Sequence, residues 1–129
     1  MRSKRELLLA AYQAFNARDI EVVLAMMHPD VDWPDGMEGG RLSGPENVRK
    51  YWTRQWNMMN PRVEPVGIVD DQAGRTVVRV HQVVRDLAGN IVIDQFVEHV
   101  YTIREGLLAR MDIREADPQQ AAAATDGFA

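Results

Sequence analysis

The hydrophobic period of this chain changes once, near Arg62, and that change limits the folds that the chain can adopt. Before it, apolar residues recur every three or four positions, which is typical of amphipathic helices. After it, apolar residues recur at every second position over four segments separated by glycine-containing turns, which is typical of antiparallel strands. Helices first and strands afterwards indicate an α+β domain with helices on one face of an antiparallel sheet.

Three helices are expected in the first sixty residues. The first begins at the capping box that Ser3 and Glu6 can form. The second begins at Asp19, a good N-cap, and ends at 28–30, where a proline stops it. The third begins at Pro45, a favoured first helical position. Their predicted buried residues are Leu7, Leu8, Ala11, Ala14 and Phe15; Val22, Val23, Met26 and Met27; and Val48, Tyr51, Trp52, Gln55 and Trp56.

The strands are expected to form one curled sheet. A short strand is predicted near the second helix, a glycine-rich loop follows it, and four longer strands come after the third helix. The predicted strands are 31–35, 62–70, 75–87, 90–104 and 107–115. The longest exceed the usual length, so bends or bulges are expected. Residues 1–117 are predicted to form a single domain and 118–129 a flexible tail.

Both faces of this sheet carry apolar residues, so both are expected to be covered. The helices cover one face, and a second copy of the chain is the simplest cover for the other. We predict that one face lines a cavity with His81, Val83, Phe96 and Glu98. The other face is predicted to bury against the second subunit through Val78, Val80, Val84, Val97, His99 and Tyr101.

Composition excludes several classes of function. The 15 basic and 19 acidic residues are mixed along the chain, so nucleic acid is not an expected partner. There is no cysteine, which removes thiol nucleophiles and fits a cytoplasmic protein. The three histidines lack the spacing of metal ligands, so neither a metal nor another cofactor is expected. No membrane span and no signal peptide are expected either.

Several short segments resemble one known superfamily. They are 12–19 (YQAFNARD), 27–33 (MHPDVDW), 42–48 (LSGPENV), 98–101 (EHVY) and 106–108 (GLL). Together they are similar to the nuclear transport factor 2-like superfamily, in the branch of SnoaL-like polyketide cyclases, ketosteroid isomerases and limonene epoxide hydrolases. The resemblance covers roughly residues 3–117. It implies a cystatin-like roll: a cone of curved, mixed sheet closed by three helices, with a deep apolar pocket and a homodimer through the outer sheet face.

The ketosteroid isomerases suggest one catalytic pattern: an aspartate base with a tyrosine and a protonated acid as oxyanion donors. The resemblance places Asp35 at the base and Glu98 at the protonated acid. Ala11 stands in place of the tyrosine. Tyr12 lies about 100° further around the helix and is not expected to substitute.

The limonene epoxide hydrolases suggest a second pattern. The resemblance places Arg79 at the arginine of that family, His81 in place of an aspartate, and Asp112 at the last-strand aspartate. Trp33 and Asp35 replace the two residues that position water. A histidine held by a carboxylate is a competent base near neutral pH. The plain alternatives are that Asp35 is only a turn residue and that Glu98 pairs with an arginine of the neighbouring strand.

The sequence therefore predicts a small-molecule-binding protein. The leading interpretation is that this protein is an acid–base enzyme that works without a cofactor: an isomerase, a cyclase or an epoxide hydrolase. Asp35 or the His81–Asp112 pair would move a proton, and Glu98 or Arg79 would stabilise charge. The expected substrate is small and apolar or polycyclic, held by Trp33, Trp52, Trp56, Val83 and Phe96. The alternative is a non-catalytic ligand-binding or dimerisation module of the same fold.

Overall fold

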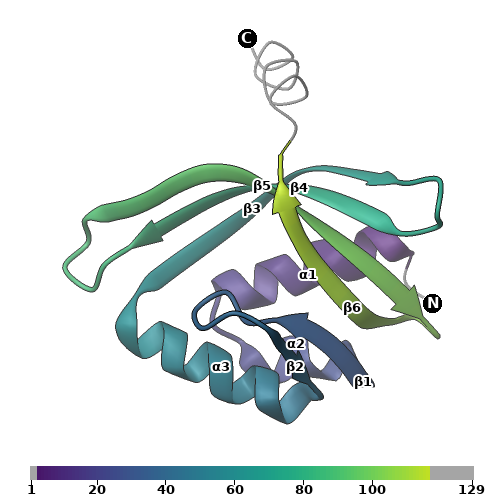
Figure 1. The fold of residues 1–129 in the computed structure, drawn as a ribbon, viewed down its shortest axis with the longest axis horizontal. Coiled ribbons are helices and arrows are strands. Elements are labelled where there is room, and N and C mark those ends of the chain that lie inside the picture. Colours follow the sequence, from purple (N-terminus) through teal and green to yellow (C-terminus); the bar gives the residue numbers. More distant parts are fainter. Residues whose placement is uncertain (1–2, 117–129) are drawn as a thin grey trace, which may run out of the picture.

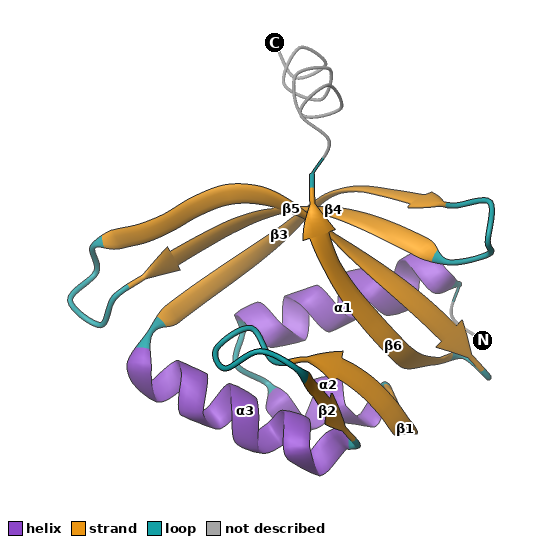
Figure 2. Ribbon diagram, viewed as in Figure 1, coloured by secondary structure: helices purple, strands orange, loops and turns teal. Residues whose placement is uncertain are grey.

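The computed structural model describes residues 3–116, which form three helices and a six-stranded sheet (Figures 1 and 2). The helices are α1 (Lys4–Asn16), α2 (Ile20–Ala25) and α3 (Pro45–Met58). The strands are β1 (Met27–Pro34), β2 (Arg41–Ser43), β3 (Asn60–Asp70), β4 (Thr76–Arg85), β5 (Ile91–Arg104) and β6 (Leu107–Glu115). The tail predicted at 118–129 lies outside the described residues. None of the helices within 3–116 is long and apolar enough to cross a membrane.

The helices begin where the sequence predicts. The hydroxyl of Ser3 accepts a hydrogen bond from the backbone N–H of Glu6 and donates to its carboxylate, as a capping box requires. Pro45 opens α3. The predicted end of the second helix is wrong, because α2 ends at Ala25. The next residues pair with β6 instead: the Leu108 N–H donates to the Met26 carbonyl, and β1 begins one residue later.

The sheet is curved, unclosed and mixed, with the strand order β2-β1-β6-β5-β4-β3. β1 runs parallel to β6, and every other pair is antiparallel. Strand β2 lies within the segment predicted as a loop. The pairing register shifts near Gly67, Arg85 and Ile103, and these irregularities let the long strands bend, as expected. All three helices lie on one side of the β3–β4–β5 layer (Figure 1).

The predicted assignment of the two sheet faces is wrong. Val78 and Val80 of β4, with Val97 and Tyr101 of β5, belong to the core cluster that the helices cover. They were expected to face a second subunit. The side chains predicted for the cavity therefore point to the outer face. The cause is that valines alternate on both faces of β4, so hydrophobic alternation finds the strand but cannot say which face the helices take.

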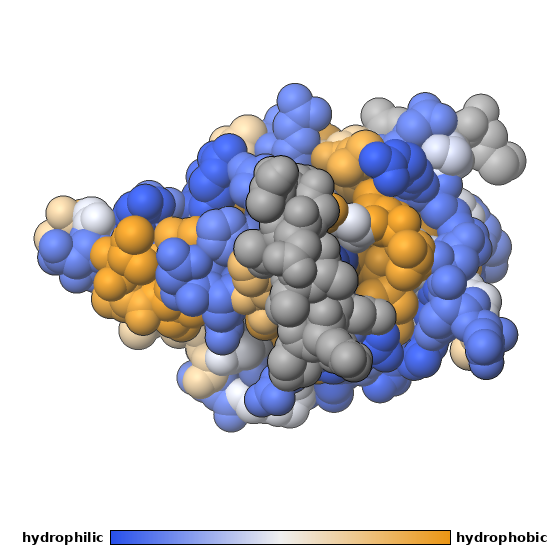
Figure 3. Space-filling model, turned by 90° about the horizontal axis from the view of Figure 1, so that it is seen from above, coloured by the Kyte–Doolittle hydropathy of each residue, from blue (hydrophilic) through white to orange (hydrophobic). Residues whose placement is uncertain are grey.

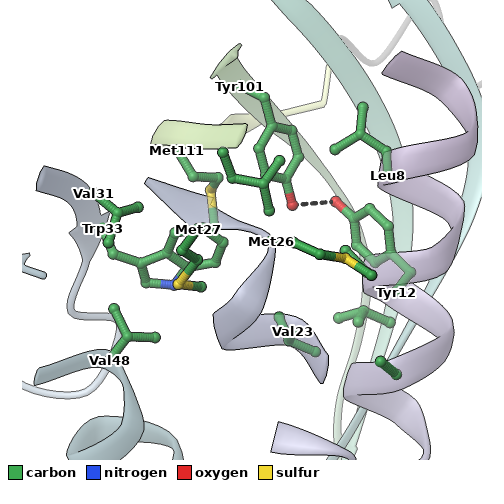
Figure 4. Packing of buried hydrophobic residues seen from close by; sticks show 14 of the residues in the cluster. Leu8, Tyr12, Val23, Met26, Met27, Val31, Trp33, Val48, Tyr101 and Met111 are labelled. Atoms are coloured by element: carbon green, nitrogen blue, oxygen red, sulfur yellow. Dashed lines mark hydrogen bonds between the residues drawn. The ribbon is translucent and has the colours of Figure 1, made fainter. Parts of the chain in front are cut away.

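The core lies between the helices and the inner face of the sheet. Its centre includes Leu8, Val31 and Val48, none of which is exposed at all. Aromatic rings from β1 and α3 pack edge to face, with 5.6 Å between the centroids of Trp33 and Trp52. Figure 4 shows this interior, with side chains from α1, α2, β1 and β5 converging. The packing leaves one end of the interior open, and the candidate site lies there.

Candidate functional site

A cavity opens between the helix layer and the inner face of the sheet. The centre of a water-sized sphere can occupy about 90 Å³ of it, and all the empty space at the site, open solvent included, is about 670 Å³. Among residues 3–116, no aspartate, glutamate, lysine or arginine lines the cavity. The lining residues are Ala11, Tyr12, Phe15, Val23, Trp33, Pro34, Tyr51, Trp52, Gln55, Pro61, Val63, Gln82, His99, Tyr101, Leu108, Met111 and Ile113. An apolar wall with a few converging polar groups is the usual composition of a small-molecule site.

Three polar side chains in this wall form a hydrogen-bonded chain. Tyr12 comes from the middle of α1, and His99 and Tyr101 are alternate residues of β5, so they share its inner face. The Tyr101 hydroxyl donates to the Tyr12 hydroxyl over 2.9 Å. The Tyr12 oxygen lies 2.7 Å from His99 Nδ1. Figure 4 shows the two tyrosine hydroxyls pointing toward each other across the interior.

The direction of this chain fixes the tautomer of His99. Tyr12 is buried, and its hydroxyl already accepts from Tyr101. Its own proton needs an acceptor, and apart from Tyr101, which donates to it, the group among residues 3–116 within hydrogen-bonding distance is His99 Nδ1. Nδ1 is then unprotonated, and Nε2 carries the ring proton. Nε2 has no hydrogen-bond partner among residues 3–116, but it is not completely buried. Because His99 lines the cavity, we infer that Nε2 faces the open space there.

Burial keeps the three groups uncharged at neutral pH. Desolvation lowers the pKa of His99 from 6.5 to about 4. Desolvation also raises the pKa of Tyr101, and burial together with the neighbouring Tyr101 raises that of Tyr12. The site therefore presents a neutral imidazole N–H to the cavity, held in place by two neutral phenols.

This buried histidine predicts that the protein loses stability in mild acid. In the unfolded chain His99 takes up a proton near pH 6.5, whereas the folded state resists until about pH 4. Between these values the unfolded state binds more protons, so the free energy of unfolding rises with pH. The contribution of His99 is fully present above pH 6.5 and is lost as the pH falls toward 4, by roughly 3 kcal/mol. Urea unfolding at pH 7.5 and pH 5 should detect about 2 kcal/mol of this loss, since pH 5 lies about 1.5 units below the unfolded pKa.

The matched control for that measurement is His99→Gln, which removes the titrating group. Other groups still titrate in this variant, so the difference between the two pH slopes isolates His99. An identical loss of stability in the parent and in the variant would contradict the prediction.

The predicted aromatic wall is divided between two places. Trp33 and Trp52 line the cavity. Trp56 is not among the lining residues: it stacks on Trp52 at 6.0 Å between centroids, under the guanidinium of Arg18. Its indole N–H is buried and has no partner within residues 3–116.

The structure places the other predicted cavity residues on the outer face of the sheet. Glu98 accepts a hydrogen bond from Arg114 Nε over 2.7 Å. Arg79 lies opposite Glu98 in the register, with its guanidinium over the ring of Phe96. His81 Nε2 lies 2.7 Å from the carboxylate of Asp94. The imidazole ring of His81 stacks on the ring of Phe96. Val83 shares this face with His81. These residues are brought together, but away from the cavity.

The two remaining predicted carboxylates are held by backbone N–H groups in one case and by arginines in the other. One oxygen of Asp35 accepts from the backbone N–H groups of Met37 and Glu38, so it shapes the turn after β1. Asp112 forms ion pairs with Arg41 and Arg110. A hydrogen bond from Arg110 holds the pKa of Asp112 below its usual range. Neither carboxylate is among the cavity-lining groups.

The sequence interpretation missed the three residues that meet in the cavity. It assigned His99 and Tyr101 to the outer face and did not expect Tyr12 to substitute for the tyrosine that is missing at Ala11. One signal was present: His99 and Tyr101 are alternate residues of one strand and therefore share a face. No group of three or more possible metal ligands occurs among residues 3–116.

Comparisons with known proteins agree with this architecture. The family model described as "SnoaL-like domain" matches residues 8–111. The structure of TerC, co-crystallised with polyporic acid, is 29% identical, with a TM-score of 0.74 over 93% of this chain and 96% of TerC. A protein provisionally named as a polyketide cyclase from Pseudomonas putida KT2440 is 20% identical, with a TM-score of 0.77 over 96% of this chain and 98% of its own.

A third similar structure is a nuclear transport factor 2-like protein of unknown function from Burkholderia pseudomallei K96243. It is 24% identical, with a TM-score of 0.76 over 97% of this chain and 99% of its own. A comparison with curated proteins found no match.

Proposed function

The chain belongs to the SnoaL-like domain family, and we propose that it binds a small, mostly apolar molecule in its cavity and promotes an acid–base reaction of the isomerase or cyclase type. The hydrogen-bonded chain of Tyr101, Tyr12 and His99 in the wall of an apolar cavity carries the proposal, because it leaves the imidazole Nε2 without a partner among residues 3–116. A fold alone supports many functions, so the argument rests on this group.

A neutral donor in such a place can stabilise negative charge that develops on a substrate oxygen. Hydrogen bonds of this kind act strongly where water is excluded, because the local dielectric constant is low. Enolisation and ring closure through an enolate both build charge on a carbonyl oxygen. The α-proton that leaves passes to a base from the solvent, because the cavity is open and no carboxylate of residues 3–116 lines it. The His99 N–H would meet that oxygen without a rearrangement of the site, since Tyr12 already holds the ring.

Complete proton transfer through the chain is the less favourable route. If Nε2 gave up its proton and Nδ1 took one from Tyr12, the charge would pass to a buried phenolate. Burial raises the pKa of both Tyr12 and Tyr101, so that state is costly. His99 is therefore proposed as a hydrogen-bond donor to the reacting oxygen.

The test measures binding and chemistry with defined compounds. Trp33 and Trp52 line the cavity, so their fluorescence should change when a ligand enters. Polyporic acid is the first probe, because the similar protein TerC was co-crystallised with it. The aromatic ketone 2-tetralone is the second, because exchange of its acidic α-protons in D2O, followed by NMR, reports enolisation directly. We expect at least one probe to quench the tryptophan fluorescence, and we expect the α-protons of 2-tetralone to exchange faster with the protein than in buffer alone.

Asp35→Asn tests whether the turn carboxylate takes part. The amide oxygen can still accept the two backbone hydrogen bonds that Asp35 makes, so the fold should remain intact. We expect proton exchange within about threefold of the parent, because a turn residue away from the reacting atoms contributes little to catalysis. A loss of 100-fold or more would instead identify Asp35 as the base that the ketosteroid isomerase resemblance implies.

The alternative function is a non-catalytic binding module. The composition of the cavity wall favours it, since none of the carboxylates of residues 3–116 lines the cavity. The exchange assay distinguishes the two functions. In a non-catalytic binding module the ligand quenches the tryptophan fluorescence, but the α-protons of 2-tetralone exchange no faster than in buffer.

We also propose that the outer sheet face forms a homodimer interface. Arg79 is only 9% exposed, yet its Nε and Nη2 atoms have no partner within residues 3–116, and Glu98 opposite is engaged by Arg114. A buried guanidinium without a partner is costly, which favours completion by another chain. On this face Phe96 is 40% and Val69 63% exposed. Hydrophobic surface lies on either side of the grey atoms in Figure 3.

Light scattering at micromolar concentration should therefore give the mass of a dimer. Phe96→Glu places a charge in the apolar interface and should give a monomer. The matched control is Leu9→Glu, since Leu9 is an equally exposed apolar residue on α1, away from this face. A monomer mass for the parent protein would rule out the interface.

A further inference from the structure

The cavity contains a second polar group whose orientation is fixed. Gln82 of β4 lies on its wall and faces Gln95 across the β4–β5 pair. The amide of Gln95 donates to Gln82 Oε1 over 2.9 Å. One lone pair of Gln82 Oε1 is therefore used, and the two amide N–H groups of Gln82 have no partner within residues 3–116.

The two polar positions share one property. At His99, the acceptor Nδ1 is used by Tyr12, and at Gln82, the acceptor Oε1 is used by Gln95. What each offers to the cavity is an N–H donor. A ligand that satisfies these N–H groups must present hydrogen-bond acceptors, because a donor left without a partner inside the cavity is costly.

The two positions are well separated. Gln82 pairs with Gln95, which precedes His99 by four residues on the same strand face. At about 3.3 Å per residue this corresponds to about 13 Å along β5. An apolar residue flanks each position in the sheet, with Val63 beside Gln82 and Ile113 beside His99.

We propose that the cavity selects an elongated, mostly apolar ligand that accepts one hydrogen bond from His99 and a second, at its other end, from Gln82. The inference rests on the proposed binding function and adds the pattern of polar atoms that a ligand must carry. A compact ketone can reach one donor, whereas a rod-shaped molecule with an oxygen at each end can reach both. Gln82 is then a specificity-determining residue outside the reacting centre.

Two ligands of the same shape test the inference. The probe 4,4′-diacetylbiphenyl has a carbonyl acceptor at each end. In 4-acetyl-4′-isopropylbiphenyl one acetyl group is replaced by an isopropyl group of similar size without an acceptor. Dissociation constants come from tryptophan fluorescence and are checked by calorimetry. For the parent protein we expect the diacetyl compound to bind about three- to tenfold more tightly, as one net hydrogen bond provides.

Gln82→Leu should remove that preference and leave the affinity for the isopropyl compound within about twofold. The side chain is half-buried beside apolar residues, so leucine is compatible with the fold. Gln55→Leu is the control on α3, because Gln55 also lines the cavity, and its preference should remain that of the parent.

The outcomes separate the two proposals. Equal affinity for both compounds in the parent, or a preference that survives in Gln82→Leu, overturns the role of Gln82 and leaves the binding function intact. If the preference disappears in Gln55→Leu instead, the second donor has been wrongly assigned. If neither biphenyl nor any other probe binds, the binding function itself fails, and this inference fails with it.

Discussion

Replacement of His99 by leucine is expected to lower the rate of enolisation about 100- to 1,000-fold, the usual cost of removing one oxyanion donor. Leucine is similar in volume to the imidazole and apolar, so it keeps the wall but offers no N–H. The same change leaves the Tyr12 hydroxyl without its acceptor, which destabilises the fold by about 1–3 kcal/mol. Proton exchange of 2-tetralone by NMR measures the rate, and urea unfolding measures the stability.

Two variants distinguish the role of the His99 N–H donor from that of Tyr12, which holds the imidazole ring. Tyr12→Phe leaves Nε2 in the cavity but frees the ring to adopt either tautomer, so a smaller loss is expected than for leucine. His99→Gln supplies an amide donor and should recover part of the rate. If His99→Leu retains the rate of the parent while remaining folded at the assay temperature, His99 is not the donor.

Replacement of Trp52 by alanine is expected to cost about 3–5 kcal/mol of unfolding free energy, the usual range for a buried tryptophan. Trp52 is 4% exposed and contacts aromatic rings on three sides: Trp33, Phe15 and Trp56, at 5.6, 5.1 and 6.0 Å between centroids. Domains of this size are stable by only about 5–15 kcal/mol, so the loss is large. Thermal and urea unfolding at pH 7.5 measure it.

The matched control is Thr53→Ala, the next residue of α3, which is exposed. It should change stability by less than about 0.5 kcal/mol, because surface substitutions away from special contacts have small effects. Trp52→Phe should lie between the two, since it keeps one ring of the cluster. A cost below 1 kcal/mol for Trp52→Ala would show that this aromatic cluster does not hold α3 to β1.

The order of elements was predictable because it depends on local signals. Capping at Ser3 and the proline at Pro45 fix helix starts through backbone groups only a few residues away. The turns between the long strands carry Gly74, Gly89 and Gly106, each with the positive φ that favours glycine. Such features act within a few residues, so the sequence alone determined three helices, then hairpins, and the α+β class.

The end of α2 and the strand β2 were not predictable in this way, because both depend on partners far along the chain. Met27 pairs with Leu108, and β2 exists only because Trp33 and its neighbours offer an edge to Leu42. Local propensity for a helix or a loop was outweighed by hydrogen bonds to another strand.

The candidate site was decided by tertiary structure for the same reason. The sequence alone determined that His99 and Tyr101 share one face of a strand and that Glu98 lies on the other. It did not determine which face the helices cover, since valines occupy both sides of β4. Tyr12 and His99 are 87 residues apart, and only the packing of α1 on the sheet brings their side chains together. The same packing buries the imidazole, lowers its pKa, and leaves Nε2 facing the cavity.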